Sequence, residues 1–259
     1  MRALRVLALA VATACSPLAS AATVTIDWQS GGSYGVFDPA SGMPIGTING
    51  PDPVGQVTTR AGRFLGEIAA TDGIDAAEFY LSPDHFFAYC HDLSEVLSNS
   101  TYTVSVGASE AVLDFLGAVN AVLAPASDSP YDWISPADKY IAGAVQLGIW
   151  EALYDTGFDL GLGSLTFGLA VSGTMNAQML AHYNAFVTAM DTAQSLDGQY
   201  VLLLTNTGSS PQTTNRQIPG TQDVIAARYV PQGLLVPEPG TLLLLASAAA
   251  AAAFTRRRS

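Results

Sequence analysis

The order of apolar and polar positions predicts two groups of β-strands. Residues 23–28 (TVTIDW) alternate between apolar and polar side chains, as in a strand with one buried face. Residues 78–90 (EFYLSPDHFFAYC) and 101–107 (TYTVSVG) are rich in the aromatic and β-branched residues that favour strands. The same features return at residues 199–206 (QYVLLLTN) and 222–230 (QDVIAARYV). Strands therefore flank the middle of the chain on both sides.

Three segments between these groups have helical patterns. They occupy residues 108–124, 135–155 and 174–194. The first starts at Ser109 and the third near Thr174. The second has Ser135 as N-cap and Pro136 at the first helical position, where proline is tolerated. Strands, then helices, then strands predict an α+β domain: a sandwich or barrel-like β-lobe with an inserted helical lobe of about three helices.

The glycines and prolines of residues 29–56 predict a long loop without regular structure. The central region, residues 23–235, contains this loop. It is long enough for one domain with a substantial core.

The N-terminus, residues 1–22, has the pattern of a secretory signal peptide. Arg2 and Arg5 precede an apolar run, and the small residues of SPLASAA follow it at a spacing that a signal peptidase accepts. The alternative is a lipoprotein cleavage box with Cys15 as the lipidated residue. If the signal peptide leaves as a unit, Cys90 is the only cysteine of the exported protein.

The C-terminus, residues 236–259, combines VPEPG, an apolar stretch and an arginine-rich end. The stretch is shorter than the roughly 20 apolar residues of a membrane span, and its arginines favour the cytoplasmic side. This order of features resembles the PEP-CTERM sorting signal of Gram-negative bacteria. The resemblance implies that an exosortase recognises Pro237, Glu238 and Pro239 after transient insertion in the inner membrane. It then removes the tail and delivers the protein to the cell surface or a biofilm matrix. A simple tail anchor is the alternative.

The negative net charge of the chain argues against some classes of binding partner. The net charge is −12, and five arginines lie in the two terminal segments, so the central region is more acidic still. Such a surface repels nucleic acids and anionic headgroups. We therefore expect neither as a partner.

Cys90 and Gln146 are the candidate reactive pair. The second helix is apolar on nearly every side from Ile141 to Tyr154, which predicts a buried helix interrupted only by Gln146 and Glu151. At about 100° per residue these two lie on largely opposite sides, so if Glu151 faces solvent, Gln146 points inward. A buried amide needs a polar or reactive partner. A cysteine thiol that attacks the glutamine carbonyl and expels ammonia would form an internal thioester.

The two motifs resemble those of bacterial surface thioester domains. The matching residues are Tyr89, Cys90, Gln146, Ile149 and Trp150. The resemblance implies a thioester between Cys90 and Gln146, shielded from water by Tyr89, Ile149 and Trp150. It also implies a covalent adhesin that captures a protein amine or a polysaccharide hydroxyl. Three positions depart from the pattern, namely Val145, Gly148 and His91.

Each of these residues has a simpler interpretation. Free cysteines are often buried and inert, so the alternative is a non-reactive matrix or structural protein with a reduced Cys90. A secreted cysteine hydrolase using Cys90 and His182 is a further alternative. Side chains alternate along a strand, so Cys90 and His91 are expected on opposite sides, which argues against a base or metal site joining Cys90 to His85 or His91. We expect no enzyme activity, no metal and no cofactor.

Overall fold

The computed structural model describes residues 21–28, 43–51, 55–80, 86–93, 95–125, 129–155, 157–169, 173–206 and 218–231. The predicted signal peptide therefore lies almost entirely outside the described residues. The sorting signal lies wholly outside them, with Pro237, Glu238 and Pro239, and so does His85.

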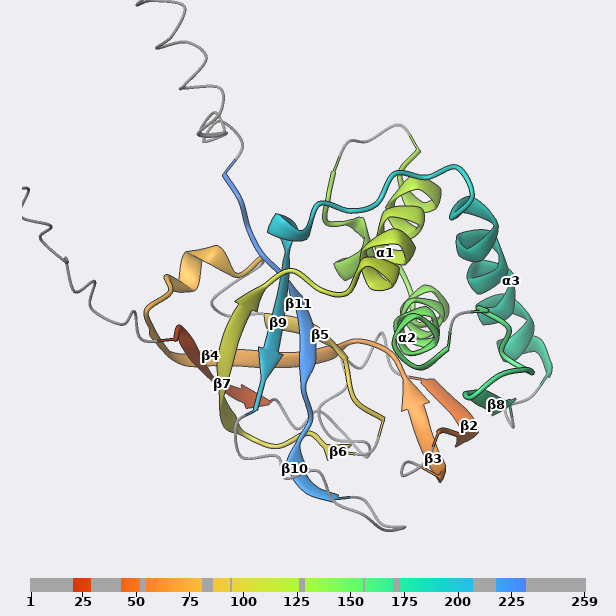
Figure 1. Cartoon of the computed structure of the whole chain (residues 1–259), viewed down its shortest axis with the longest axis horizontal. Helices are drawn as coiled ribbons and strands as arrows, with labels where there is room; N and C mark the ends of the chain where they lie inside the picture. The colour runs from red at the N-terminus through yellow and green to blue at the C-terminus, as the bar shows by residue number, and fades with distance from the viewer. Residues whose placement is uncertain are drawn as a thin grey trace, which may run out of the picture.

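Six antiparallel strands form a closed barrel in the order β1-β4-β5-β11-β9-β7 (Figure 1). These strands are β1 (Thr23–Trp28), β4 (Phe64–Asp72), β5 (Phe86–Cys90), β7 (Ser100–Val106), β9 (Val201–Thr205) and β11 (Val224–Ala227). Closure pairs every strand on both sides and leaves no long edge exposed. The barrel-like form of the predicted β-lobe is thus confirmed.

The barrel interior is filled with aromatic rings around Trp28. Its ring lies 5.9 Å from Phe64, 5.7 Å from Phe86 and 6.3 Å from Tyr102 between centroids. The indole N–H donates to the Tyr102 hydroxyl at 3.1 Å, so the buried polar group is satisfied.

Three helices between β7 and β9 form the second lobe. They are α1 (Glu110–Leu123), α2 (Lys139–Tyr154) and α3 (Gly173–Ala189). Figure 1 shows them together at one side of the barrel. The central helix α2 packs on α1 and α3 and also on strands β2, β3 and β5. The predicted α+β fold with an inserted helical lobe is confirmed.

Short elements complete the fold. Strands β2 (Met43–Asn49), β3 (Gln56–Ala61) and β8 (Thr166–Leu169) make a three-stranded sheet, and β6 (Glu95–Val96) pairs with β10 (Ile218–Thr221). Single 3-10 turns occur at η1 (Ala76–Glu78), η2 (Asp132–Ile134) and η3 (Gly198–Tyr200).

Two local predictions were wrong, and two strands were missed. Residues 43–49 form β2 although the loop composition predicted no regular structure, because β3 and β8 pair with this segment on both sides. The strands at β3 and β4 were not predicted. The second helix begins at Lys139 rather than after Ser135, because the Asp138 side chain accepts hydrogen bonds from the N–H groups of Tyr140 and Ile141 and caps it there.

Candidate functional site

Cys90 ends β5, where it pairs with Val224 of β11 on one side and has no β4 partner on the other. The His91 N–H donates to the Asp223 carbonyl at 2.8 Å, on the β11 side. Because successive residues of a strand direct their N–H and C=O to opposite sides, Cys90 directs its own toward β4. The β4 strand begins at Phe64, which pairs with Ala88, so no β4 residue lies opposite Cys90.

The side chain of Gln146 occupies this gap. Its Oε1 accepts a hydrogen bond from the Cys90 N–H at 2.8 Å, and its Nε2 donates to the Cys90 carbonyl at 2.9 Å. Gln146 is fully buried on α2. The amide therefore satisfies two backbone groups that would otherwise be buried without partners, as a neighbouring strand would. The predicted inward orientation of Gln146 is confirmed.

This arrangement brings an amide carbonyl against the backbone of the only described cysteine. The Cys90 N–H points at the carbonyl oxygen, where negative charge would develop if a nucleophile attacked the carbon. Burial raises the pKa of the Cys90 thiol well above its usual value, and the charge of Asp92 raises it further, while a hydrogen bond with the Gln222 side chain lowers it. The thiol is thus neutral in the folded protein.

The face on which each side chain of β5 lies follows from Phe86, which packs on Trp28 inside the barrel. By strand alternation Cys90 points to the same interior face, and Tyr89 to the opposite one. The Tyr89 hydroxyl accordingly donates to the Trp133 carbonyl at 3.3 Å, outside the barrel. Tyr89 is fully buried there.

Ile149 and Trp150 lie on α2 within one turn of Gln146, and both are buried. The Trp150 ring stacks on Phe167 of β8 with centroids 6.4 Å apart. The Trp150 ring thus lies between α2 and the β2–β3–β8 sheet. Their proposed role in shielding a thioester stays a prediction.

Glu151 does not face solvent, so the assumption made from the sequence was wrong. It is fully buried, and neither carboxyl oxygen has a hydrogen-bond partner among the described residues. Burial raises its pKa to about 8, with the charges of Asp155 and Asp159 adding to the effect. Helix α2 is enclosed by α1, α3 and strands, so it has no solvent face at this level.

Gly148 allows α1 and α2 to approach closely. A Cβ atom at this position would lie 1.8 Å from Cζ of Phe115. That ring is itself held between Phe158 and Phe186, at centroid distances of 5.8 and 6.2 Å. Glycine in α2 is therefore matched to a large side chain in α1.

We expect Gly148→Ala to lower the free energy of unfolding by about 3 kcal/mol. Alanine would favour the helix by up to ~1 kcal/mol, but overpacking against Phe115 outweighs this gain. Urea denaturation measures the change. Gly157→Ala is the control, because its added Cβ would meet nothing closer than 3.9 Å. Equal stability of Gly148→Ala and wild type would contradict the tight packing.

His182 lies apart from this site in the fold. It is on α3, which packs on α1 and α2, and its ring stacks on Phe186 at 6.3 Å. Residues near Cys90 that sequence reasoning missed are Asp92, Gln222 and Asp223. They lie at the ends of two predicted strands, but only the pairing of β5 with β11 brings them together.

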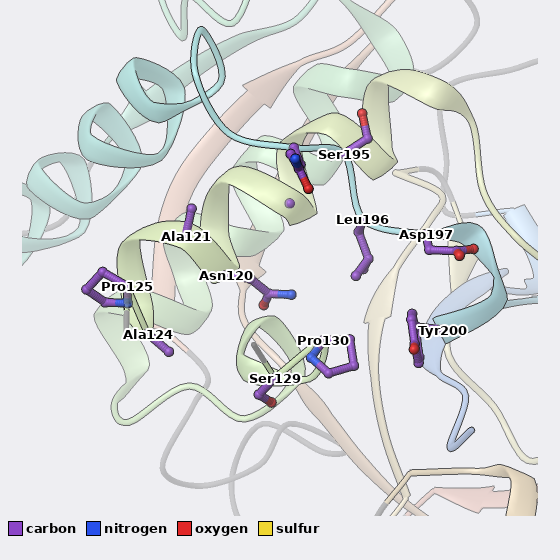
Figure 2. A pocket seen from close by; sticks show the side chains of 12 residues that line it. Asn120, Ala121, Ala124, Pro125, Ser129, Pro130, Ser195, Leu196, Asp197 and Tyr200 are labelled. Atoms are coloured by element: carbon purple, nitrogen blue, oxygen red, sulfur yellow. The ribbon is translucent and has the colours of Figure 1, made fainter. Parts of the chain in front are cut away.

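A separate pocket of about 490 Å³ lies between α1 and the loop that leads into β9. Figure 2 shows Asn120 projecting from α1 and Tyr200 on the other side. Neither Cys90 nor Gln146 lines it. The candidate pair is thus buried in packed protein and does not belong to this pocket.

Comparison with known protein families finds a match near the C-terminus of the chain. A model of the PEP-CTERM protein-sorting motif matches residues 235–258. The chain carries a PEP-CTERM sorting motif. This confirms the resemblance drawn from VPEPG and its flanks, and it implies an exported protein that an exosortase processes. The described residues contain no helix with the length and apolarity needed to cross a membrane.

One solved structure resembles this chain weakly. It is the N-terminal thioester domain of a protein F2-like fibronectin-binding protein from Streptococcus pneumoniae, with 11% identity and a TM-score of 0.36. The match covers 77% of this chain and 98% of that one. No curated protein matches the chain.

Proposed function

We propose that this PEP-CTERM protein is a surface or matrix adhesin with an internal thioester between Cys90 and Gln146. The observation that carries the proposal is the pair of hydrogen bonds, 2.8 and 2.9 Å long, that hold the Gln146 amide against the Cys90 backbone. They hold the Gln146 carbonyl against the backbone of the residue that carries the buried thiol. The sorting motif supports an extracellular destination, reached after transient insertion in the inner membrane.

Formation of the bond needs no outside reactant. Cys90 Sγ attacks Cδ of Gln146, and the electron pair of the C=O bond moves onto Oε1, where the Cys90 N–H stabilises it. The C–N bond then breaks, and the amide nitrogen leaves as ammonia with the thiol proton. The product is a thioester and the chain is lighter by one ammonia.

Use of the bond is a transfer to a partner. An amine or hydroxyl on a protein or polysaccharide attacks the thioester carbonyl, the C–S bond breaks, and the nucleophile's proton returns to Cys90. The glutamyl group is then joined to the target through an amide or ester bond. Burial of the pair keeps water from the same reaction until a partner approaches.

We expect the purified chain to be lighter than its sequence by one ammonia in an intact mass spectrum. Methylamine should then add its full mass and release a thiol that reacts with thiol reagents. Gln146→Glu is the matched control, because a carboxylate of nearly the same shape holds no ammonia to lose. Cys90→Ala should show neither the deficit nor the adduct. A full sequence mass, with no methylamine adduct, rules the thioester out.

A non-reactive structural protein is the second candidate. The same two hydrogen bonds complete the backbone pairing of Cys90 with the amide intact, and burial holds the thiol neutral. In that case the mass equals the sequence mass. Thiol reagents then label Cys90 on unfolding without any prior nucleophile.

A further inference from the structure

Three side chains at the end of β5 and the start of β11 form a second cluster, which the thioester reaction does not use. They are His91, Asp92 and Asp223, and one nitrogen or oxygen atom from each lies within 4.8 Å of the others. His91 Nδ1 is 3.4 Å from Oδ1 of Asp92. All three are half-buried, so the cluster is open to solvent on one side.

The backbone orients both carboxylates. Asp92 Oδ2 accepts a hydrogen bond from the Asp223 N–H at 2.9 Å, and Asp223 Oδ1 accepts one from the Asn206 N–H at 2.7 Å. Each of these bonds uses one oxygen of its carboxylate. The two negative side chains are thus fixed close to each other.

The donor set and spacing match those of a transition-metal site. Metal bonds of roughly 2.0 to 2.2 Å to imidazole nitrogen and carboxylate oxygen place neighbouring ligand atoms about 3 to 4.4 Å apart. The 3.4 Å between His91 Nδ1 and Asp92 Oδ1 falls within this range, and the ligand atoms of all three residues lie within 4.8 Å of one another. Imidazole favours zinc and related ions over calcium or magnesium, which prefer oxygen alone. The exposed side leaves room for a water ligand.

We propose that His91, Asp92 and Asp223 together bind a divalent first-row transition-metal ion, with zinc as the best match. The ion would join the end of β5 to the start of β11, next to the point where Gln146 closes the gap beside Cys90. Cys90 is not a ligand in this arrangement, because its side chain points into the barrel and its thiol interacts with Gln222. The proposal does not depend on the thioester.

Calorimetric titration of the metal-free full chain with zinc chloride tests the site. We expect saturable binding of one ion and a higher melting temperature with zinc, because the ion binds only the folded state. His91→Ala and Asp223→Asn should each weaken binding at least ten-fold, a loss no smaller than that seen for outer-shell changes. Asn at position 223 still offers an oxygen to the Asn206 N–H, so this variant is expected to fold, as circular dichroism can verify.

Two controls separate this site from other zinc sites on the chain. His182→Ala removes a histidine outside the cluster and should bind zinc as wild type does. Cys90→Ala should also keep its affinity, which separates the metal site from thiol binding and from the thioester. The proposal is overturned by non-saturable binding, by unchanged affinity in His91→Ala and Asp223→Asn, or by loss of binding in Cys90→Ala. Calcium binding as tight as zinc binding would also overturn it.

Discussion

A chain with Cys90→Ala and Gln146→Leu is expected to be about 4 kcal/mol less stable than one with Cys90→Ala alone. The leucine removes the oxygen that accepts from the residue-90 N–H and the nitrogen that donates to its carbonyl. Two buried backbone groups then lose their partners, at about 1–3 kcal/mol each. The Cys90→Ala background excludes any thioester, so the difference reports the hydrogen bonds alone.

Urea denaturation at equilibrium measures this difference. Gln56→Leu in the same background is the control, because Gln56 is exposed and its side-chain amide donates to the exposed Asn49 side chain at 3.1 Å. Its effect should stay within about 0.5 kcal/mol. If the Gln146→Leu change cost as little as this control, the amide would not be closing the gap in the barrel. The candidate site would then lose its structural basis.

The second large effect concerns Glu151 and pH. Its pKa is raised from 4.5 to about 8 in the folded chain, so between these values the folded state holds a proton that the unfolded state has released. The free energy of unfolding therefore falls as pH rises through this window, and the stabilisation is complete only below the lower value. Each pKa unit corresponds to ~1.4 kcal/mol. Because water entering on ionisation relaxes the site, we expect a loss of about 3 kcal/mol.

Glu151→Gln tests this by replacing the neutral carboxyl with an amide that does not titrate. Its free energy of unfolding, compared with that of wild type across the same pH window, should exceed the wild-type value at the alkaline end by about 3 kcal/mol. Near the acid end the two proteins should be about equally stable. Parallel curves would show that Glu151 is solvated and not buried.

Much of the fold could be predicted because its local signals agree with the tertiary structure. Alternation at residues 23–28 and the aromatic strand ending at Cys90 correspond to β1 and β5, and the apolar middle helix is α2. The strands that were missed, β2, β3 and β4, lie in segments rich in glycine, threonine or charged residues. β2 pairs with the distant strand β8, and β4 pairs with β1 and β5, whereas β3 is held by its neighbour β2. A local pattern does not report such pairing.

The residues of the candidate site could also be predicted only in part from the sequence. Gln146 was placed inside the protein on the assumption that Glu151, on the opposite side of the helix, faces solvent. Gln146 is buried as predicted, although that assumption is wrong. The prediction for Glu151 failed because the same helix is covered on all sides, so periodicity did not separate a buried carboxyl from an exposed one. Gly148 departs from the motif of the thioester domains, and the local pattern does not show that Phe115 occupies the space of the missing side chain.

The sequence by itself determined that the chain is exported and sorted, because a PEP-CTERM motif acts through contiguous residues. It also determined that Cys90 is the single cysteine after Cys15. Only the tertiary structure decided that Gln146 meets the backbone of Cys90, and that His91 and Asp92 meet Asp223. Closing the barrel brings β5, β11 and α2 together, and such long-range pairing depends on the packing of the whole domain rather than on any local run of residues.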